Sequence, residues 1–292
     1  MVIIVTGGAG FIGSNLIKQL LERYPNAQIV SIDNYFIGSE QNHIDNSRVD
    51  YRVGHSMDIN EMWAEMPYEQ VDAVFHLGEY SRIVQSFADI DMVWDYNMRG
   101  TKEVVKFCGA HSCRLIYAGS SSKFGNEGAD ENLSPYAWIK AKNIEYIKNF
   151  SNWFGLDYVI TYFYNVYGAG HLKMGDYATV IGIFETQYAK GEPLTVVAPG
   201  TQSRDFTHVE DIVSGIITCY EKGKGDGYCL GTGQPEQIIE LARMFTDNYV
   251  LIPERQGERY AGQADNAKVR ALGWEPKHSL ADYIASFKES VV

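Results

Sequence analysis

Short apolar runs alternate with stretches of helical periodicity through the first half of the chain. The apolar runs predict β-strands at residues 2–5, 28–32, 50–53, 73–77, 114–118 and 158–163. Apolar residues recur at helical spacing near residues 12–23, 92–108 and 135–154. Strands that alternate with helices in this way predict an α/β fold, built as a doubly wound parallel sheet with helices on both faces.

This pattern changes after Tyr164. Glycine-rich loops then separate helical patterns near residues 178–190, 209–221, 237–245 and 280–288. We therefore expect two domains. Residues 1–164 form the sheet domain, and residues 165–292 form mainly a smaller, mixed α/β domain that can return a strand and a helix to the main sheet.

Composition narrows the class of protein. The 292 residues are 45% hydrophobic with a net charge of −12, and no apolar segment is long enough to span a membrane. The acidic charge argues against nucleic acid as the main partner.

The chain enters its first strand at residue 2 without a basic region or cleavage site, so we expect no secretory signal and a cytoplasmic protein. The four cysteines have no close pair at metal-ligand spacing, which predicts reduced thiols and no metal site.

A glycine cluster follows the first strand, in the sequence MVIIVTGGAGFIGSNL. Gly7, Gly10 and Gly13 fit the pattern G-x-x-G-x-x-G between a strand and a helix. Such glycines let the backbone turn sharply, so that N–H groups at the helix N-terminus approach a pyrophosphate closely. Asp33 ends the second strand twenty residues after Gly13, where a carboxylate accepts hydrogen bonds from an adenosine ribose and repels a 2′-phosphate. We therefore expect a Rossmann-type domain that binds NAD rather than NADP.

The stretch LSPYAWIKAKN places Tyr136 and Lys140 four residues apart, on one face of a helix that Ser134 caps and Pro135 begins. A phenol has a pKa of ~10 and is a poor base at neutral pH. A nearby ammonium and an oxidised nicotinamide would lower that pKa, and bringing it near 7 needs roughly 4 kcal/mol. Alone, the pattern also fits a surface lysine beside a half-buried tyrosine.

Serine hydroxyls follow the strand at residues 114–118, in the sequence YAGSSSKFG. At a strand terminus of a doubly wound sheet, a hydroxyl faces the ligand crevice and could hydrogen-bond a substrate hydroxyl. A serine-rich turn is the alternative interpretation.

Together these motifs resemble the extended short-chain dehydrogenase/reductases, and within them the NAD-dependent nucleotide-sugar epimerases and dehydratases related to UDP-glucose 4-epimerase. The resemblance covers nearly the whole chain. It is carried by TGGAGFIG, HLGEYSRIVQS, NMRGT, SSSKFG, YAWIK, YFYNVYGAG, GEPLTVVAPGTQSRDFTHVEDIV, PERQGERYAGQAD and ALGWEP, in the family's order.

The resemblance implies a role for each matching residue. Ser120 would be the catalytic serine, with its neighbouring serines as alternatives, Tyr136 would be the base, and Lys140 would hold the nicotinamide ribose. The Asp58-Ile59 pair would meet the adenine. The remaining cofactor-binding residues that it implies are Gly7, Gly10, Phe11, Ile12, Gly13, Asp33, Asn34, Leu77 and Asn97. For Asn97, which matches an asparagine that organises the catalytic helix, a purely structural role is the alternative.

On the substrate side, the resemblance implies that Ser122 and Asn165 contact a nucleotide-diphosphate sugar, while Arg204 and Arg255 grip its pyrophosphate. A guanidinium fork fits phosphate oxygens bidentately, so two converging arginines would let an acidic protein hold this dianion.

The resemblance also narrows the reaction. The 4,6-dehydratases carry Asp-Glu directly after the catalytic residue, where this chain has Ser121-Ser122, and the glutamate of UDP-glucuronate decarboxylases is absent too. We therefore expect an epimerase, with a 4-epimerase on a UDP-hexose as the main hypothesis and a dehydratase as the alternative. A non-catalytic NAD-binding sensor is a third class, against which the intact Ser120, Tyr136 and Lys140 argue.

Two departures from the family pattern leave the substrate and chemistry open. Glu79, in HLGE, stands where alanine is usual and would be either an additional acid/base group or a polar lining residue. Gly262 stands where some 4-epimerases carry a tyrosine, which would leave room for an N-acetyl group. Relatives are usually homodimers through the helices at residues 92–108 and 135–154, and we expect a homodimer here.

Overall fold

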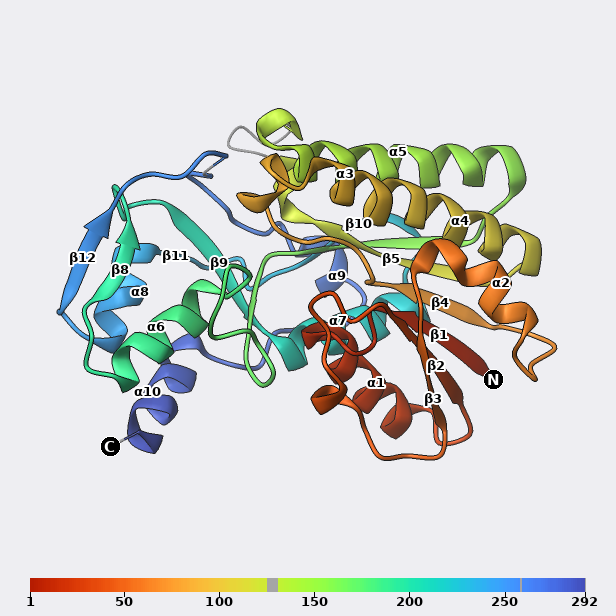
Figure 1. The fold of residues 1–292 in the computed structure, drawn as a ribbon, viewed down its shortest axis with the longest axis horizontal. Helices are drawn as coiled ribbons and strands as arrows, with labels where there is room; N and C mark the ends of the chain where they lie inside the picture. Colours follow the sequence, from red (N-terminus) through yellow and green to blue (C-terminus); the bar gives the residue numbers. More distant parts are fainter. Residues whose placement is uncertain (125–130, 258, 292) are drawn as a thin grey trace.

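The main sheet of the computed structural model, which describes residues 1–124, 131–257 and 259–291, has seven parallel strands in the order β10-β6-β5-β4-β1-β2-β3 (Figure 1). The sheet confirms the predicted doubly wound fold. The strands at its centre are buried along nearly their whole length because both faces are covered. The strands of the sheet are β1 (Val2–Thr6), β2 (Gln28–Asp33), β3 (Val49–Val53), β4 (Ala73–His76), β5 (Arg114–Ser120), β6 (Tyr158–Phe163) and β10 (Gly225–Leu230).

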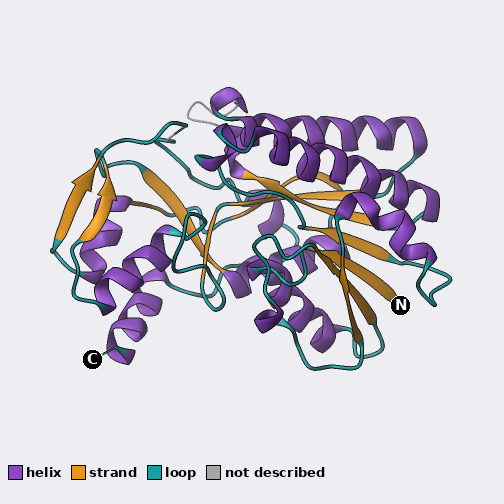
Figure 2. Ribbon diagram, viewed as in Figure 1, coloured by secondary structure: helices purple, strands orange, loops and turns teal. Residues whose placement is uncertain are grey.

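Helices cover both faces of this sheet (Figure 2). Along β1, Ile3 and Val5 pack in a cluster with α1 (Phe11–Arg23) and α7 (Val209–Lys222), whereas Ile4 packs in the cluster on the opposite face. The helices of that opposite face are α2 (Ile59–Ala64), α3 (Ile90–Val93), α4 (Gly100–His111) and α5 (Pro135–Phe154). The single helix expected near residues 92–108 is interrupted, because a π-helical stretch, Trp94–Arg99, separates α3 from α4.

The C-terminal part forms a smaller lobe with its own core, which includes Phe184, Leu194, Leu241 and Phe245. Its two small sheets have the strand orders β11-β9-β7 and β12-β8. The elements of the lobe are β7 (Asn165–Tyr167), α6 (Val180–Ala189), β8 (Leu194–Val197), β9 (Ser203–His208), β11 (Pro235–Gln237), α8 (Ile238–Phe245), β12 (Tyr249–Ile252) and α10 (Leu280–Ser290).

Part of the second half of the chain belongs to the main sheet. β10 pairs with β6, α7 packs on β6 and β10, and the short helix α9 (Ala267–Arg270) lies against β10. Residues on both sides of position 164 thus contribute to the main sheet, and the predicted domain boundary at residue 164 stays a prediction. No helix of the described residues is long and apolar enough to cross a membrane.

The strand order also fixes where a ligand can bind. β1 and β4 lie side by side at the centre, while the chain proceeds outward from β1 through β2 to β3, and from β4 through β5 to β6. The loops after β1 and β4 therefore leave in opposite directions and open a crevice at the carboxyl ends of the strands.

A buried carboxylate, Glu185 on α6, joins three segments of the smaller lobe. It accepts hydrogen bonds from His171 Nε2 at 3.0 Å and from Tyr283 Oη at 2.7 Å, and it lies 2.7 Å from Lys173 Nζ. Burial raises the pKa of this carboxyl, but the bonds from His171, Lys173 and Tyr283 outweigh burial and lower it to about 2, from an ordinary value of 4.5.

A Glu185→Gln variant should therefore change how stability depends on pH. A carboxyl with a depressed pKa contributes stability that is complete above 4.5 and is lost as the pH falls toward 2. Between pH 6 and pH 3 we expect the wild type to lose about 2 kcal/mol of unfolding free energy more than the variant loses. Urea unfolding at each pH measures this, with exposed Glu192→Gln as the control, and parallel curves for wild type and Glu185→Gln would contradict the assignment.

Candidate active site

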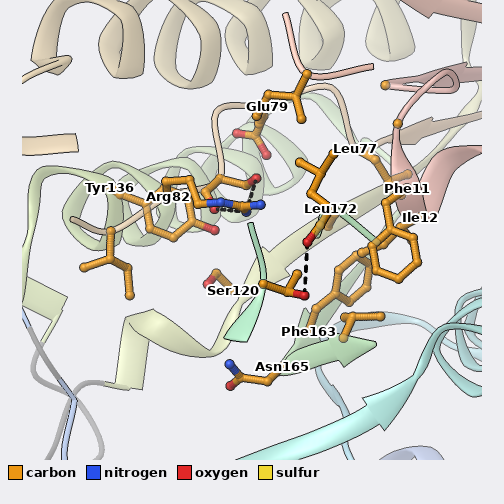
Figure 3. Close-up of a pocket in the computed structure, with 18 of the residues that line it drawn as sticks. Phe11, Ile12, Leu77, Glu79, Arg82, Ser120, Tyr136, Phe163, Asn165 and Leu172 are labelled. Atoms are coloured by element: carbon orange, nitrogen blue, oxygen red, sulfur yellow. Dashed lines mark hydrogen bonds between the residues drawn. The ribbon is translucent and has the colours of Figure 1, made fainter. Parts of the chain in front are cut away.

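A cavity of about 570 Å³ opens at the carboxyl ends of β1, β4 and β5 and extends to the smaller lobe (Figure 3). It brings together most of the residues that the sequence singles out. Those that line it are Gly7, Gly10, Phe11, Ile12, Gly13, Asp33, Asn34, Leu77, Ser120, Ser122, Tyr136, Lys140, Asn165, Arg204 and Arg255.

The glycine turn after β1 leaves room for a dinucleotide. Gly7 has a φ of +73°, and a Cβ on Gly13 would lie 2.0 Å from the carbonyl oxygen of Gly7, so side chains are excluded there. Gly10 caps α1 without a side-chain hydrogen bond, which leaves the first N–H groups of the helix directed at the cavity. These features fit the diphosphate of NAD.

Asp33 lies beside this turn. Its carboxylate accepts hydrogen bonds from the N–H groups of Ala9, at 3.0 Å, and Tyr35, at 2.8 Å. Burial raises the pKa of Asp33, and the two backbone hydrogen bonds oppose that shift. The carboxylate keeps lone pairs that can accept hydrogen bonds from ribose hydroxyls.

Three predicted cofactor residues do not line the cavity. Ile59 is completely buried in the core and Asp58 is the residue just before α2, while His55 and Ser56 line the cavity. Asn97 exchanges two hydrogen bonds with the backbone of Tyr80, at 2.7 and 2.8 Å. This contact fixes the loop after β4, which supports the structural role for Asn97, and the adenine contacts of Asp58 and Ile59 stay predictions.

The predicted catalytic hydroxyls face the same end of the cavity. Ser134 Oγ accepts a hydrogen bond from the Ala137 N–H at 3.1 Å, and this cap begins α5 one residue before Pro135, as predicted. Tyr136 follows in the first turn and is buried against the cavity wall. Ser120, at the end of β5, lines the cavity (Figure 3), and its Oγ accepts a hydrogen bond from Ser122 Oγ at 2.8 Å.

Lys140 forms a buried ion pair with Glu79. The side chains of Lys140 and Glu79 are 4% and 2% exposed. The ammonium also donates to the carbonyl oxygen of Ala118 at 2.6 Å and to Tyr117 Oη at 3.4 Å. Its positive charge is therefore neutralised by the protein.

The second carboxylate oxygen of Glu79 accepts three further hydrogen bonds. They come from Thr101 Oγ1 at 3.0 Å, Tyr117 Oη at 3.0 Å and Asn143 Nδ2 at 3.1 Å. A carboxylate with this many partners is held in one position. This arrangement favours the interpretation of Glu79 as a lining residue over that of an additional acid or base.

The sequence analysis missed two arginines that line the cavity. Arg259 is 7% exposed and donates from Nη1 to Ser121 Oγ at 2.9 Å, and Arg82 projects from the loop after β4. Their positions in the sequence could have indicated them. Arg259 follows the predicted site residue Arg255 by four residues, and Arg82 follows His76, the last residue of β4, by six. Gly262, by contrast, is not a lining residue, and a Cβ there would meet Arg259.

One group of possible metal ligands occurs among the described residues. The ligand atoms of His208, Glu210 and His278 lie within 4.8 Å of one another, outside the cavity. However, His208 Nδ1 accepts the Glu210 N–H at 3.3 Å, so the proton of the neutral ring is on Nε2. That nitrogen then has no lone pair for a cation, and we keep the prediction of no metal site.

The Lys140–Glu79 pair can be tested by a double-mutant cycle. Glu79→Leu and Lys140→Met should each lower the free energy of unfolding by about 3–5 kcal/mol, because each leaves one buried charge without its partner. The double variant should lose less than the sum of the two single losses by at least about 2 kcal/mol.

The matched control is the exposed pair Lys106–Glu103, which lies at 3.1 Å on α4 and should show a coupling of about 1 kcal/mol or less. Urea unfolding measures all variants, and additive losses at Glu79 and Lys140 would contradict the pairing.

Comparisons with known proteins agree with this geometry. The solved structure of UDP-glucose 4-epimerase from Thermotoga maritima, with UDP-glucose, superposes with a TM-score of 0.91 at 26% identity, and the match covers 100% of this chain and 97% of that one. A dTDP-glucose 4,6-dehydratase from Streptomyces venezuelae, with NAD bound, gives a TM-score of 0.89 at 26% identity over 99% and 96% of the two chains. An ADP-L-glycero-D-manno-heptose-6-epimerase from Brachyspira hyodysenteriae is 29% identical over 94% of this chain and 92% of its own. The model of the NAD dependent epimerase/dehydratase family matches residues 3–231, and the chain therefore belongs to this family of NAD-dependent enzymes.

Proposed function

We propose that this protein is a nucleotide-sugar 4-epimerase that acts on a UDP-hexose through a 4-keto sugar. The observation that carries the proposal is the placement of Tyr136 and Ser120 on the wall of the same cavity as the glycine turn of the NAD site. The similarity to a UDP-glucose 4-epimerase along the whole chain supports it.

In this reaction Tyr136 takes the proton of the C4 hydroxyl, and Ser120 holds that hydroxyl by a hydrogen bond. When bound, NAD would supply the hydride acceptor for C4 and the hydride donor for the other face of the keto sugar, and the glycine turn with Asp33 would hold it. Lys140 lies one turn further along α5, where its ion pair with Glu79 fixes the helix against β5 and thereby holds Tyr136 in position.

The smaller lobe would bind the nucleotide diphosphate. Asn165 begins β7, Arg204 lies on β9, and both line the cavity with Arg255. Guanidinium groups from two separate segments can bind both phosphates and leave the hexose next to Tyr136.

The acidic side chains that line the described cavity argue against a dehydratase. They are Asp33, Glu79 and Asp176. Asp33 lies at the glycine turn and Glu79 is paired with Lys140, while Asp176 is exposed at the rim. The Asp-Glu pair that dehydratases use is replaced by Ser121 and Ser122. These observations support an epimerase over a dehydratase.

We also propose a homodimer through α5 and the helices near residues 90–111. Apolar side chains remain exposed on these elements in the monomer, with Ile90 at 54%, Trp94 at 46% and Trp138 at 36% exposure. Large exposed apolar side chains on neighbouring elements are typical of a subunit contact.

Tyr136→Phe tests the role of the base. We expect kcat for C4 epimerisation to fall at least ~100-fold, because the variant keeps the ring but cannot take the proton. NMR of the products from a panel of nucleotide sugars measures turnover, and absorbance detects NADH formed on mixing. Tyr146→Phe on the same helix is the control and should keep full activity. Undiminished turnover by Tyr136→Phe, or a dehydrated 4-keto-6-deoxy product from the wild type, would overturn the proposal.

Asp33→Ala tests the choice of cofactor. Removing the carboxylate should weaken NAD binding about tenfold or more and reduce the preference for NAD over NADP, since a charged hydrogen bond contributes ~1.5–3 kcal/mol. Because burial raises the pKa of Asp33, the affinity of the wild type for NAD should fall as the pH is lowered through that raised value. Calorimetric titrations with both cofactors measure this, with exposed Asp45→Ala as the control. Equal affinity of wild type and Asp33→Ala for NAD would contradict the assigned role.

A further inference from the structure

Arg82 carries a positive charge into the cavity without an acidic partner. Its Nε donates to the carbonyl oxygen of Tyr177 at 3.1 Å, and Nη2 donates to the same oxygen. Its Nη1 donates to the carbonyl oxygen of Ser81 at 2.9 Å and to Ser81 Oγ at 3.3 Å. All these acceptors are neutral, and no carboxylate within residues 1–124, 131–257 and 259–291 pairs with this guanidinium.

This charge is unusual for its surroundings. Arg82 is half-buried, and the charge of a partly desolvated guanidinium is compensated better by a carboxylate or phosphate than by neutral carbonyls. Burial lowers the pKa of Arg82, and the groups that oppose this are the phenols of Tyr136, Tyr80 and Tyr177. Lys140, another cation that lines the cavity, is already neutralised by Glu79. Arg82 therefore carries a charge into the cavity that no carboxylate of the described residues compensates.

Arg82 belongs to a different segment of the cavity wall than Arg204 and Arg255. Arg204 and Arg255 come from the smaller lobe, whereas Arg82 follows β4 and lies in the view beside Tyr136 and Leu172 (Figure 3). Its contacts with Ser81 and Tyr177 fix the plane of the guanidinium. These four hydrogen bonds use four of its five N–H groups and leave one N–H of Nη2 for a ligand. The donor is thus oriented before a ligand binds.

We propose that Arg82 binds an acidic group on the sugar, so that the substrate is a nucleotide sugar whose hexose carries a carboxylate, as a uronic acid does. The inference rests on the proposed function, in which the hexose lies next to Tyr136. A carboxylate there would complete the charge pairing of Arg82 by a charge-assisted hydrogen bond. A neutral hexose would leave the guanidinium desolvated and unpaired, so the site would discriminate against it.

A second role of Arg82 has to be separated from this one. Arg82 and Gln85 both donate to backbone carbonyls of the 168–179 segment, at Tyr177 and Asp176, and so hold that segment against the loop after β4. Holding a carbonyl requires a donor but no charge. Arg82→Gln keeps a donor and removes the charge, Arg82→Lys keeps the charge, and Gln85→Ala removes the other contact with the segment.

The experiment measures binding of UDP-glucuronate and UDP-glucose to the NAD-loaded full chain by calorimetry. We expect the wild type to bind UDP-glucuronate at least tenfold more tightly than UDP-glucose. Arg82→Gln should bring this ratio close to one, Arg82→Lys should keep most of it, and Gln85→Ala should leave it unchanged. A ratio taken within one protein cancels any general loss of binding caused by a displaced segment.

Equal binding of the two sugars by the wild type would overturn the inference without any variant, and so would an unchanged ratio in Arg82→Gln. Its failure is distinguishable from that of the proposed function, because binding is measured without turnover. If the wild type prefers the acidic sugar but does not epimerise it at C4, the proposed reaction is wrong and the role of Arg82 stands. If it epimerises neutral UDP-hexoses and shows no such preference, the proposed reaction stands and the role of Arg82 is wrong.

Discussion

The buried ion pair between Lys140 and Glu79 is the contact on which the geometry of this active site depends. It joins α5 to the loop after β4, and through Tyr117 and Ala118 it joins both to β5. Ser120 and Tyr136 come from β5 and α5, so their relative position is set by this pair. Because both charges lie away from water, the pair is held by geometry and by many hydrogen bonds, and a loss of either member would leave a costly charge in the core.

The pair also changes the electrostatics around Tyr136. In the pattern that the sequence suggested, the ammonium four residues further along the helix is the cation that favours the phenolate. Here that ammonium is compensated by Glu79, whereas no carboxylate of the described residues pairs with the guanidinium of Arg82. This difference from the expected pattern depends on Glu79 alone, because an alanine at this position would leave the charge of Lys140 uncompensated.

The sequence predicted the features that depend on local chemistry. β1, α1 and the start of α5 follow from apolar periodicity, the glycine turn and the cap at Ser134, and each involves residues close in sequence. The short strands of the smaller lobe, such as β7, have too few residues to show a period. The partners of Glu79 and Arg82 lie 61 and 95 residues away, and no periodicity connects them. Arg259 was missed for the same reason, since only the fold brings it to Ser121.

The seventh strand of the main sheet has a consequence for how this protein is made. β10 covers the β6 edge and comes from residues 225–230, long after the other six strands have been synthesised. Until the ribosome has released that segment, the backbone of β6 presents an open row of amides and carbonyls to other chains. The nascent chain therefore carries an unpaired strand edge from the synthesis of β6 to that of β10, and the pairing of this one strand ends the exposure.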